Sequence, residues 1–302
     1  MMQLRAQGAA WLQAGTPAVL VEVSAARGSV PRERGTRMLV AADATAGTIG
    51  GGHLELQAIA RARAMLASGD TGVQAAHFPL GPALGQCCGG AVTLSFCIFD
   101  AAALAAWPQA SPLFHLQLYG AGHVGRAIAQ ALAPLNVSVD WIDERDDEFP
   151  SHFFAHGGDW PAHIRKVCVD SVEAEVSEAP AGAFFLVLSH RHDLDLRITQ
   201  AILQRGDFAF FGLIGSKTKR QSFVHRLQER GVAARRISRM TCPIGIEGIT
   251  GKEPEIIAAA VVAQLLQQGC RRPSAESPEL GIAPAGSLRH DPTRRRLQEE
   301  TP

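Results

Sequence analysis

The side chains best suited to chemistry in this 302-residue chain are those of two adjacent cysteines, Cys87 and Cys88. Glycines flank the pair on both sides, so the thiols are expected to lie in an accessible loop. Accessible thiolates bind soft metals or accept sulfur. Structural thiols are the alternative, but these usually lie within an apolar run. The glycine-rich setting therefore favours a functional pair.

A second candidate site lies directly before a predicted helix, at Gly50, Gly51, Gly52 and His53. Glycine amides can approach an anion closely, and a helix N-terminus attracts negative charge. A tight strand-to-helix turn would also use glycine, but three in a row carry an entropic cost that a simple turn does not require. Arg32, in a nearby glycine- and arginine-rich turn, adds a guanidinium group suited to bidentate binding of an oxyanion.

A third glycine turn contains Gly120, Gly122 and Gly125, between a predicted strand and a predicted helix. The spacing fits the G-x-G-x-x-G pattern of dinucleotide-binding proteins. Asp143 closes the next predicted strand, about 20 residues further on, where that pattern places the ribose-binding acid. Arg145 could accommodate a 2′-phosphate, so the choice between NAD and NADP stays open. The alternative is a Rossmann turn that binds no dinucleotide.

Two polar loops are expected to meet at the carboxyl edge of the same sheet, where ligands of doubly wound folds lie. Residues 189–195 include histidines and aspartates that could ligate a metal, although Asp193 or Asp195 could equally cap the next helix. Residues 215–220 are basic at a helix start. An anionic ligand or an acidic partner would account for these cations, and so would a solvated helix end.

The elements that must position these residues fall into two groups. Residues 1–100 are predicted to form a glycine- and cysteine-rich α+β domain, with helices over 2–14 and 54–67 and strands over 17–24, 37–41, 73–78 and 91–99. Residues 101–112, which include two prolines, are the predicted linker. Residues 271–302 are rich in Pro, Ser, Arg and Glu without periodicity, and we expect a disordered tail there.

Residues 113–270 alternate between strand and helix patterns, which is typical of a parallel sheet. Strands are predicted over 114–119, 137–142, 166–169, 183–188 and 208–213, and helices over 122–133, 195–204, 218–231 and 253–268. No crossover helix is evident between Asp143 and Lys166, so that side of the unit is expected to be abbreviated. The predicted fold class is α/β: an N-terminal α+β domain followed by a Rossmann-like parallel-sheet domain.

Composition excludes several classes of protein. Lys plus Arg and Asp plus Glu both number 29, so no overall charge attracts nucleic acid or an anionic membrane. No apolar run approaches the roughly 20 residues that span a bilayer, and the N-terminus lacks a signal-peptide pattern. The six cysteines lack the spacing of a disulfide framework or a structural zinc site. We therefore expect a soluble cytoplasmic protein, and a homodimer is the ordinary expectation for its assembly.

The ordered motifs of residues 28–268 resemble those of the xanthine dehydrogenase accessory protein family, the XdhC/CoxI family. The resemblance rests on segments 28–32, 47–55, 86–90, 120–125, 212–216 and 242–245. It implies a chaperone that binds molybdenum cofactor, holds it while a cysteine desulfurase supplies the terminal sulfur, and passes it to xanthine dehydrogenase. It further implies that Cys87 or Cys88 contacts or protects the metal centre and that the glycine turn and Arg32 hold the cofactor phosphate.

Two other functions stay open on the sequence. An NAD(P)-dependent oxidoreductase would use the 120–125 turn and Asp143, but no acid–base constellation lies beside a hydride-transfer position and the cysteine pair would have no role. A sulfurtransferase would use Cys87 or Cys88 as its nucleophile and form a persulfide on the protein. The chaperone leaves the sulfur on the cofactor, and we favour this non-catalytic role.

Overall fold

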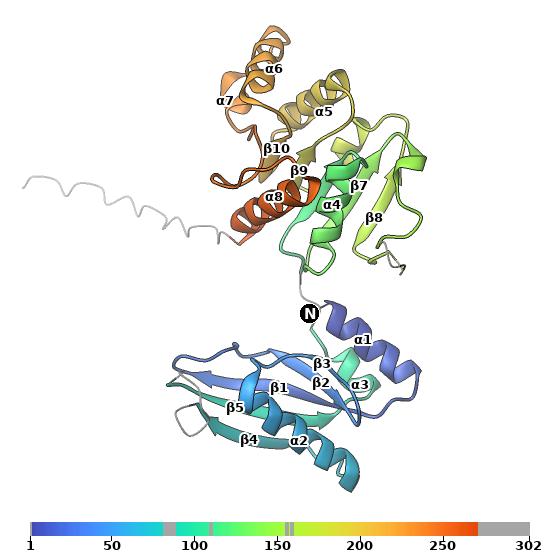
Figure 1. Ribbon diagram of the computed structural model, residues 1–302, viewed down its shortest axis with the longest axis vertical. Helices are drawn as coiled ribbons and strands as arrows, with labels where there is room; N and C mark the ends of the chain where they lie inside the picture. Colours follow the sequence, from blue (N-terminus) through green and yellow to red (C-terminus); the bar gives the residue numbers. More distant parts are fainter. Residues whose placement is uncertain (1, 81–88, 109–110, 155–156, 158–159, 271–302) are drawn as a thin grey trace, which may run out of the picture.

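The structure is a computed structural model that describes residues 2–80, 89–108, 111–154, 157 and 160–270. The described chain contains two sheets, each with its own hydrophobic core (Figure 1). The first sheet is antiparallel and the second is parallel, which confirms the predicted fold class. The cysteine pair Cys87 and Cys88 and the tail predicted at 271–302 lie outside the described residues.

The antiparallel sheet has the strand order β3-β2-β1-β5-β4. Its strands are β1 (Ala18–Arg27), β2 (Arg37–Ala41), β3 (Thr45–Gly47), β4 (Gln74–Pro79) and β5 (Ala91–Ile98). Successive residues of β1 enter different cores, because side chains alternate across a strand. Val19 and Val21 pack under α2 (Gly52–Ser68), whereas Ala18 and Leu20 belong to a second cluster on the other face.

The second cluster also covers part of the predicted linker. Helix α3 (Ala101–Ala105) packs against α1 (Met2–Gln13), and Asp100 caps α3 by accepting a hydrogen bond from the amide of Ala103 at 2.7 Å. Trp107 is buried against Phe99 with an edge-to-face ring geometry. The first half of residues 101–112 therefore belongs to the packing of the N-terminal sheet.

The parallel sheet has the order β10-β9-β6-β7-β8. Its strands are β6 (His115–Tyr119), β7 (Ser138–Asp143), β8 (Ile164–Cys168), β9 (Phe184–Val187) and β10 (Phe210–Leu213). Helices α4 (His123–Leu132) and α8 (Pro254–Gly269) cover one face, and α5 (His192–Arg205), α6 (Lys217–Glu229) and α7 (Ala234–Ile237) contribute to the core on the other. Strands β7 and β8 lie on one side of β6, and β9 and β10 lie on the other. The strand order therefore reverses between β6 and β9, where ligands of such sheets bind.

The connection between β7 and β8 lacks a crossover helix in its described residues, as predicted. Its described regular structure is one 3₁₀ turn, Asp146–Glu148. Aromatic rings fill the space instead: Trp141 contacts Phe149, Phe153 and Trp160 at centroid distances of 5.2, 6.5 and 5.6 Å. This cluster replaces the apolar face that a helix would supply.

An ion pair between a buried carboxylate and an exposed guanidinium joins β7 to β8. Arg165 donates hydrogen bonds of 2.9 and 2.8 Å to the two carboxylate oxygens of Asp140, and the ring of His115 lies 3.5 Å from the second oxygen. Burial alone would raise the pKa of Asp140, but the hydrogen bonds from His115 and Arg165 outweigh it and hold that pKa well below its usual range. Asp140 therefore stays ionised in the fold to a lower pH than a free aspartate does.

Candidate functional site

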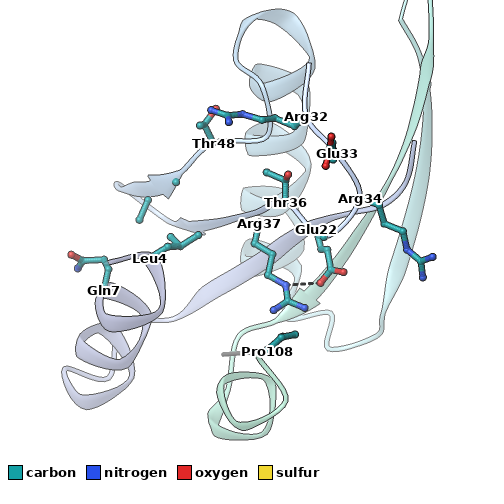
Figure 2. Close-up of a pocket in the computed structure, with 13 residues that line it drawn as sticks. Leu4, Gln7, Glu22, Arg32, Glu33, Arg34, Thr36, Arg37, Thr48 and Pro108 are labelled. Carbon is teal, nitrogen blue, oxygen red and sulfur yellow. Dashed lines mark hydrogen bonds and ion pairs between the residues drawn. The ribbon is translucent and has the colours of Figure 1, made fainter. Parts of the chain in front are cut away.

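An open pocket of about 850 Å³ lies in the N-terminal unit, between α1, β3 and the turn that leads into β2 (Figure 2). Its charged and hydroxyl lining includes Glu22, Arg32, Arg34, Arg37 and Thr48. Figure 2 shows Arg32 beside Thr48 at one end of the pocket and the Arg37–Glu22 pair at the other. With Glu33, the described lining of the pocket thus contains three guanidinium groups and two carboxylates.

One of these arginines is fixed by the protein. The Nε of Arg37 lies 2.7 Å from a carboxylate oxygen of Glu22, and its guanidinium lies 4.9 Å from the ring centroid of Trp107. Trp107 is buried, and its indole N–H has no hydrogen-bond partner among the described residues. Pro108, the next residue, lines the pocket. Residues of the predicted linker therefore help to form one wall.

The other two arginines are available. Arg32 and Arg34 are exposed, and neither forms an ion pair within the part of the chain that the structure describes. Guanidinium groups bind planar and tetrahedral oxyanions through paired N–H donors. Figure 2 shows the two side chains pointing to opposite sides of the turn, and both are exposed and unpaired among the described residues, so either can turn toward an oxyanion that enters the pocket.

The backbone amides of the glycine turn before α2 are less available than the sequence predicted. We expected Gly50, Gly51 and Gly52 to offer free amides to an anion, but a carboxylate of the chain already occupies part of this position. Glu55 accepts hydrogen bonds of 3.0 Å from the amides of Ile49 and Gly51, and of 2.5 Å from the Thr48 hydroxyl. The three glycines all have positive φ, which explains the glycine run by conformation.

His53 and Arg32 keep their expected neighbourhood. A side chain at Gly50 would meet Pro31 at 2.7 Å, so the glycine turn packs directly on the turn that contains Arg32. His53 is exposed on α2, where its ring lies 2.9 Å from the Gln57 amide nitrogen. The predicted neighbours thus lie together, although the amides of Ile49 and Gly51 are satisfied internally.

The ends of the cysteine loop lie beside the same turn. The amide of Leu80 donates a 2.8 Å hydrogen bond to the carbonyl of Gly90, which closes the base of the loop. A Cβ at Gly90 would lie 2.4 Å from the carbonyls of Arg27 and Ser29, so only glycine fits there. Cys87 and Cys88 themselves lie outside the described residues. Connectivity therefore joins the cysteine-bearing segment to the turn that precedes Arg32.

In the parallel sheet, two of the three glycines in the third turn are required by packing. A Cβ at Gly125 would lie 2.0 Å from the carbonyl oxygen of Gly120, and a Cβ at Gly120 would lie 2.4 Å from that of Leu188. A Cβ at Gly122 would meet nothing within 4 Å. Gly120 and Gly125 therefore close the turn, and only Gly122 lies next to open space.

Asp143 lies where the dinucleotide pattern predicts, but its oxygens are already bonded. They accept hydrogen bonds from the amide of Ala121 at 2.7 Å and from Nε and Nη2 of Arg145 at 3.0 Å each. Burial would raise the pKa of Asp143, and the bonds from Arg145 and Ala121 outweigh it and lower that pKa. Arg145, which could have bound a 2′-phosphate, instead pairs with Asp143 and with Glu148 at 2.7 Å.

The cavity beside this turn has a volume of about 10 Å³, which is room for about one water molecule. A ribose hydroxyl would have to compete with Arg145 for Asp143. Dinucleotide binding at the turn stays a prediction.

The two polar loops at the carboxyl edge do meet, as expected. Asp195 is 1% exposed in its side chain and lies 2.7 Å from Nζ of Lys219, which also donates to the carbonyl of Ile214 at 2.8 Å. The other oxygen of Asp195 accepts from the amide and hydroxyl of Ser189 at 3.0 and 2.6 Å. The charge of Lys219 is therefore balanced by Asp195 and needs no bound anion. Within the described ranges, no group of three or more His, Cys, Asp or Glu side chains is placed to hold a metal ion.

Comparison with known proteins places both units in one family. Residues 116–265 match the XdhC Rossmann domain, and residues 11–78 match the XdhC and CoxI family. The chain belongs to the XdhC and CoxI family. This membership confirms the resemblance inferred from the ordered motifs.

Two relatives extend the comparison. The uncharacterized protein YqeB of Escherichia coli (strain K12) is 31% identical over 264 residues, which are 83% of this chain and 43% of YqeB. The chain thus spans less than half the length of this curated relative. A crystal structure from Bacillus halodurans, described as a xanthine dehydrogenase, covers 91% of this chain and 98% of its own, with a TM-score of 0.70 and 18% identity. At that identity the likeness shows the fold alone.

Sequence reasoning missed Glu22, Arg37 and Trp107 as parts of the site. A signal for Glu22 existed, because it is a charged residue inside an apolar strand and a half-buried carboxylate needs a partner. Its partner, Arg37, begins the next strand, and the register pairs the two residues directly. Trp107 gave no such signal, since it lay in the alanine-rich segment that we predicted to be a linker.

No helix among the residues that the structure describes is long and apolar enough to cross a membrane.

Proposed function

We propose that this member of the XdhC and CoxI family is an accessory protein in the maturation of xanthine dehydrogenase. It binds molybdenum cofactor, holds it while a cysteine desulfurase supplies the terminal sulfur, and delivers it to the enzyme. Family membership across both units supports the maturation role. The N-terminal pocket with its two unpaired arginines is the observation that supports cofactor binding.

The residues of the pocket fit this cargo. Its volume of about 850 Å³ lies within the range of roughly 300–1,000 Å³ that is usual for ligand pockets. Molybdenum cofactor is a molybdenum–dithiolene pterin that ends in a phosphate, and Arg32 and Arg34 offer the donors that a phosphate requires. Thr48 and the carboxylate of Glu33 also line the pocket and can pair with the polar edges of a pterin.

Each part of the pocket has a distinct task in this proposal. Arg32 and Arg34 bind the phosphate end, and the Arg37–Glu22 pair forms a fixed wall that orients the ring system. The segment that bears Cys87 and Cys88 joins the sheet at Gly89 and Gly90, beside the same turn, and we assign one of these thiols to the metal end. When bound, the cofactor supplies the molybdenum centre that receives the sulfur.

The exposure of the arginines suits a carrier. Exposed ion pairs contribute about 0.2–1 kcal/mol each and are screened by salt, so a phosphate held by Arg32 and Arg34 can be released to another protein. A resident cofactor would instead be expected in a closed site. The open pocket therefore favours transfer over permanent retention.

Analysis of protein purified from cells that make molybdenum cofactor tests the proposal. We expect molybdenum and pterin fluorescence in stoichiometric amounts with the wild-type protein. The double variant Cys87→Ala, Cys88→Ala is expected to retain less molybdenum while its fold, measured by circular dichroism, is unchanged. Absence of both molybdenum and pterin from the wild-type protein would refute cofactor binding. Normal retention by the double variant would refute only the role of the cysteines.

A further inference from the structure

Four arginines gather at the amino edge of the parallel sheet, where α5 ends and the chain enters β10. Arg205, Arg235, Arg236 and Arg239, together with Gly206 and Asp207, line an open pocket of about 360 Å³ that we name the arginine cluster. This edge is opposite the one at which Gly120 and Ser189 lie, because residues 205–208 precede β10. The arginine cluster is therefore separate from the glycine turn and from the N-terminal pocket.

Part of the arginine cluster is explained by the fold. Arg236 donates to the carbonyls of Leu203, at 3.2 Å, and Gln204 in the last turn of α5, and Arg239 donates to that of Gly206 at 2.5 Å. Cations are favourable at a helix C-terminus, where carbonyl groups lack partners within the helix. These bonds fix the two side chains in place. Carbonyl groups carry no net charge, however, so they leave both guanidinium charges uncompensated.

The one carboxylate in the lining is already committed. Asp207 accepts bonds of 2.5 and 3.1 Å from Nε and Nη2 of Arg205. The hydrogen bonds from Arg205 lower the pKa of Asp207, and so, to a smaller degree, does the nearby charge of Arg239. Asp207 therefore neutralises one of the four guanidinium groups.

Arg235 has no role in the described fold. Its side chain is exposed and forms no hydrogen bond or ion pair with the described residues, although it lies one residue before the helix-capping Arg236. Three positive charges thus remain without a carboxylate on one small surface of a chain whose net charge is zero. Such a surface attracts and orients a negatively charged partner.

The shape of the arginine cluster favours a protein over a small anion. Sites for small ligands enclose most of the ligand, whereas this pocket is open and five of its six described lining residues carry a charge. Arginine is enriched in protein interfaces, and its planar group pairs with carboxylates through two parallel hydrogen bonds. We propose that the arginine cluster is a docking surface for a carboxylate-rich surface of a partner protein. The proposal does not depend on cofactor binding.

A labelled polyglutamate peptide tests this proposal with the full chain. We measure its binding by fluorescence anisotropy at low salt, for the wild-type protein and for Arg235→Glu. Because the side chain of Arg235 forms no hydrogen bond or ion pair with the described residues, the variant is expected to keep the wild-type unfolding midpoint. The reversal is expected to lower the affinity for the peptide by about five-fold or more, which corresponds to losing one exposed ion pair and adding a repulsion.

A charge reversal in the N-terminal unit controls for the change of net charge, with the unfolding midpoint measured because the Arg61 side chain bonds Gln74. Arg61→Glu changes the net charge equally on exposed α2, and we expect it to leave peptide affinity within about two-fold of wild type. Equal affinity of Arg235→Glu and wild type would overturn the proposal. Pyrophosphate that binds more tightly than the peptide, and that loses affinity in Arg235→Glu, would also overturn it, because the arginine cluster would then be a small-anion site.

Discussion

The two glycine turns of this protein, one before α2 and one before α4, both bind a carboxylate of the chain, but the cations beside them differ. In each turn a carboxylate of the chain bonds backbone amides: Glu55 bonds those of Ile49 and Gly51, and Asp143 bonds that of Ala121. Both turns therefore contain an internal anion where a ligand anion was expected.

The neighbouring cations separate the two regions. Arg145 beside the second turn is paired with Asp143 and Glu148, whereas Arg32 and Arg34 beside the first turn have no partner within the described chain. The charges beside the second turn thus pair with one another, whereas two of the cations beside the first turn remain unpaired among the described residues, as our proposal for the N-terminal pocket requires. A glycine turn is an incomplete indicator of a binding site, and the pairing of the adjacent cations distinguishes the two cases.

The largest expected effect compares one chemical change in both regions. Lys219→Met leaves the buried carboxylate of Asp195 without its counter-ion and is expected to lower the free energy of unfolding of the parallel-sheet unit by about 3–5 kcal/mol. Arg34→Met removes an unpaired exposed cation and should change the free energy of unfolding of the N-terminal unit by less than about 0.5 kcal/mol. Urea unfolding, with hydrogen exchange to assign the unit, measures both.

The double variant Asp195→Asn, Lys219→Met serves as the control, because it leaves no unpaired charge and should lose less stability than Lys219→Met. Equal stability of Lys219→Met and wild type would show that the pair does not hold the two loops.

The next effect concerns the second glycine turn. Gly125→Ala places a methyl group 2.0 Å from a backbone oxygen and is expected to destabilise the parallel-sheet unit by about 3 kcal/mol. Gly122→Ala faces open space and should cost less than about 1 kcal/mol, the difference between glycine and alanine before a helix. Similar losses in the two variants would contradict the assignment of Gly125 to packing and Gly122 to an open approach.

A smaller effect is expected at the first turn. Glu55→Gln removes the charge that accepts three hydrogen bonds, and we expect the N-terminal unit to lose about 1–2 kcal/mol in urea unfolding. The matched change Glu33→Gln removes an exposed acid that lines the pocket and should leave the unfolding midpoint unaltered. An unaltered midpoint in Glu55→Gln as well would mean that the internal carboxylate does not stabilise the turn.

The stability of the parallel-sheet unit should also depend on pH. Asp140 and Asp143 have lowered pKa values in the fold, so the unfolded state takes up their protons first as the pH falls. Their contribution is fully present above the ordinary aspartate pKa of about 4 and is lost as the pH falls through the folded values. Urea unfolding of the parallel-sheet unit at a series of pH values below about 5 measures this loss. Asp140→Asn is expected to reduce the slope, and an unchanged slope would contradict the role of Asp140.

The sequence predicted most of the strands and long helices because their apolar periodicity is strong. β2 was placed correctly at both ends, and α8 to within one residue at each end. β3 and α7 were missed, since three or four residues are too few to show a period. Trp107 was predicted to lie in a linker because the burial of its ring depends on packing by α1, β1 and β2, which are distant in the chain.

The candidate site was predicted less completely than the fold. Arg32 and the first glycine turn were assigned to one candidate site, and the two turns do pack together, because chain reversals at glycine bring such segments close. It did not reveal that Glu55, Asp143 and Arg145 satisfy groups that we had assigned to ligands. Those bonds depend on side-chain directions that are set only once the turns have formed. The proposed roles of Cys87 and Cys88 stay predictions.

An equilibrium titration with molybdenum cofactor tests the central claim, that the N-terminal pocket binds the cargo through its unpaired arginines. Apo-protein is titrated in three forms: the wild type, the double variant Arg32→Ala/Arg34→Ala, and a control. The control is the double variant Arg61→Ala/Arg63→Ala, which removes the same number of exposed charges from α2. We predict micromolar binding to wild type and control, and a loss of about ten-fold in the pocket variant, as expected for two ion pairs of up to about 1 kcal/mol each. Equal affinity of all three proteins would contradict the account.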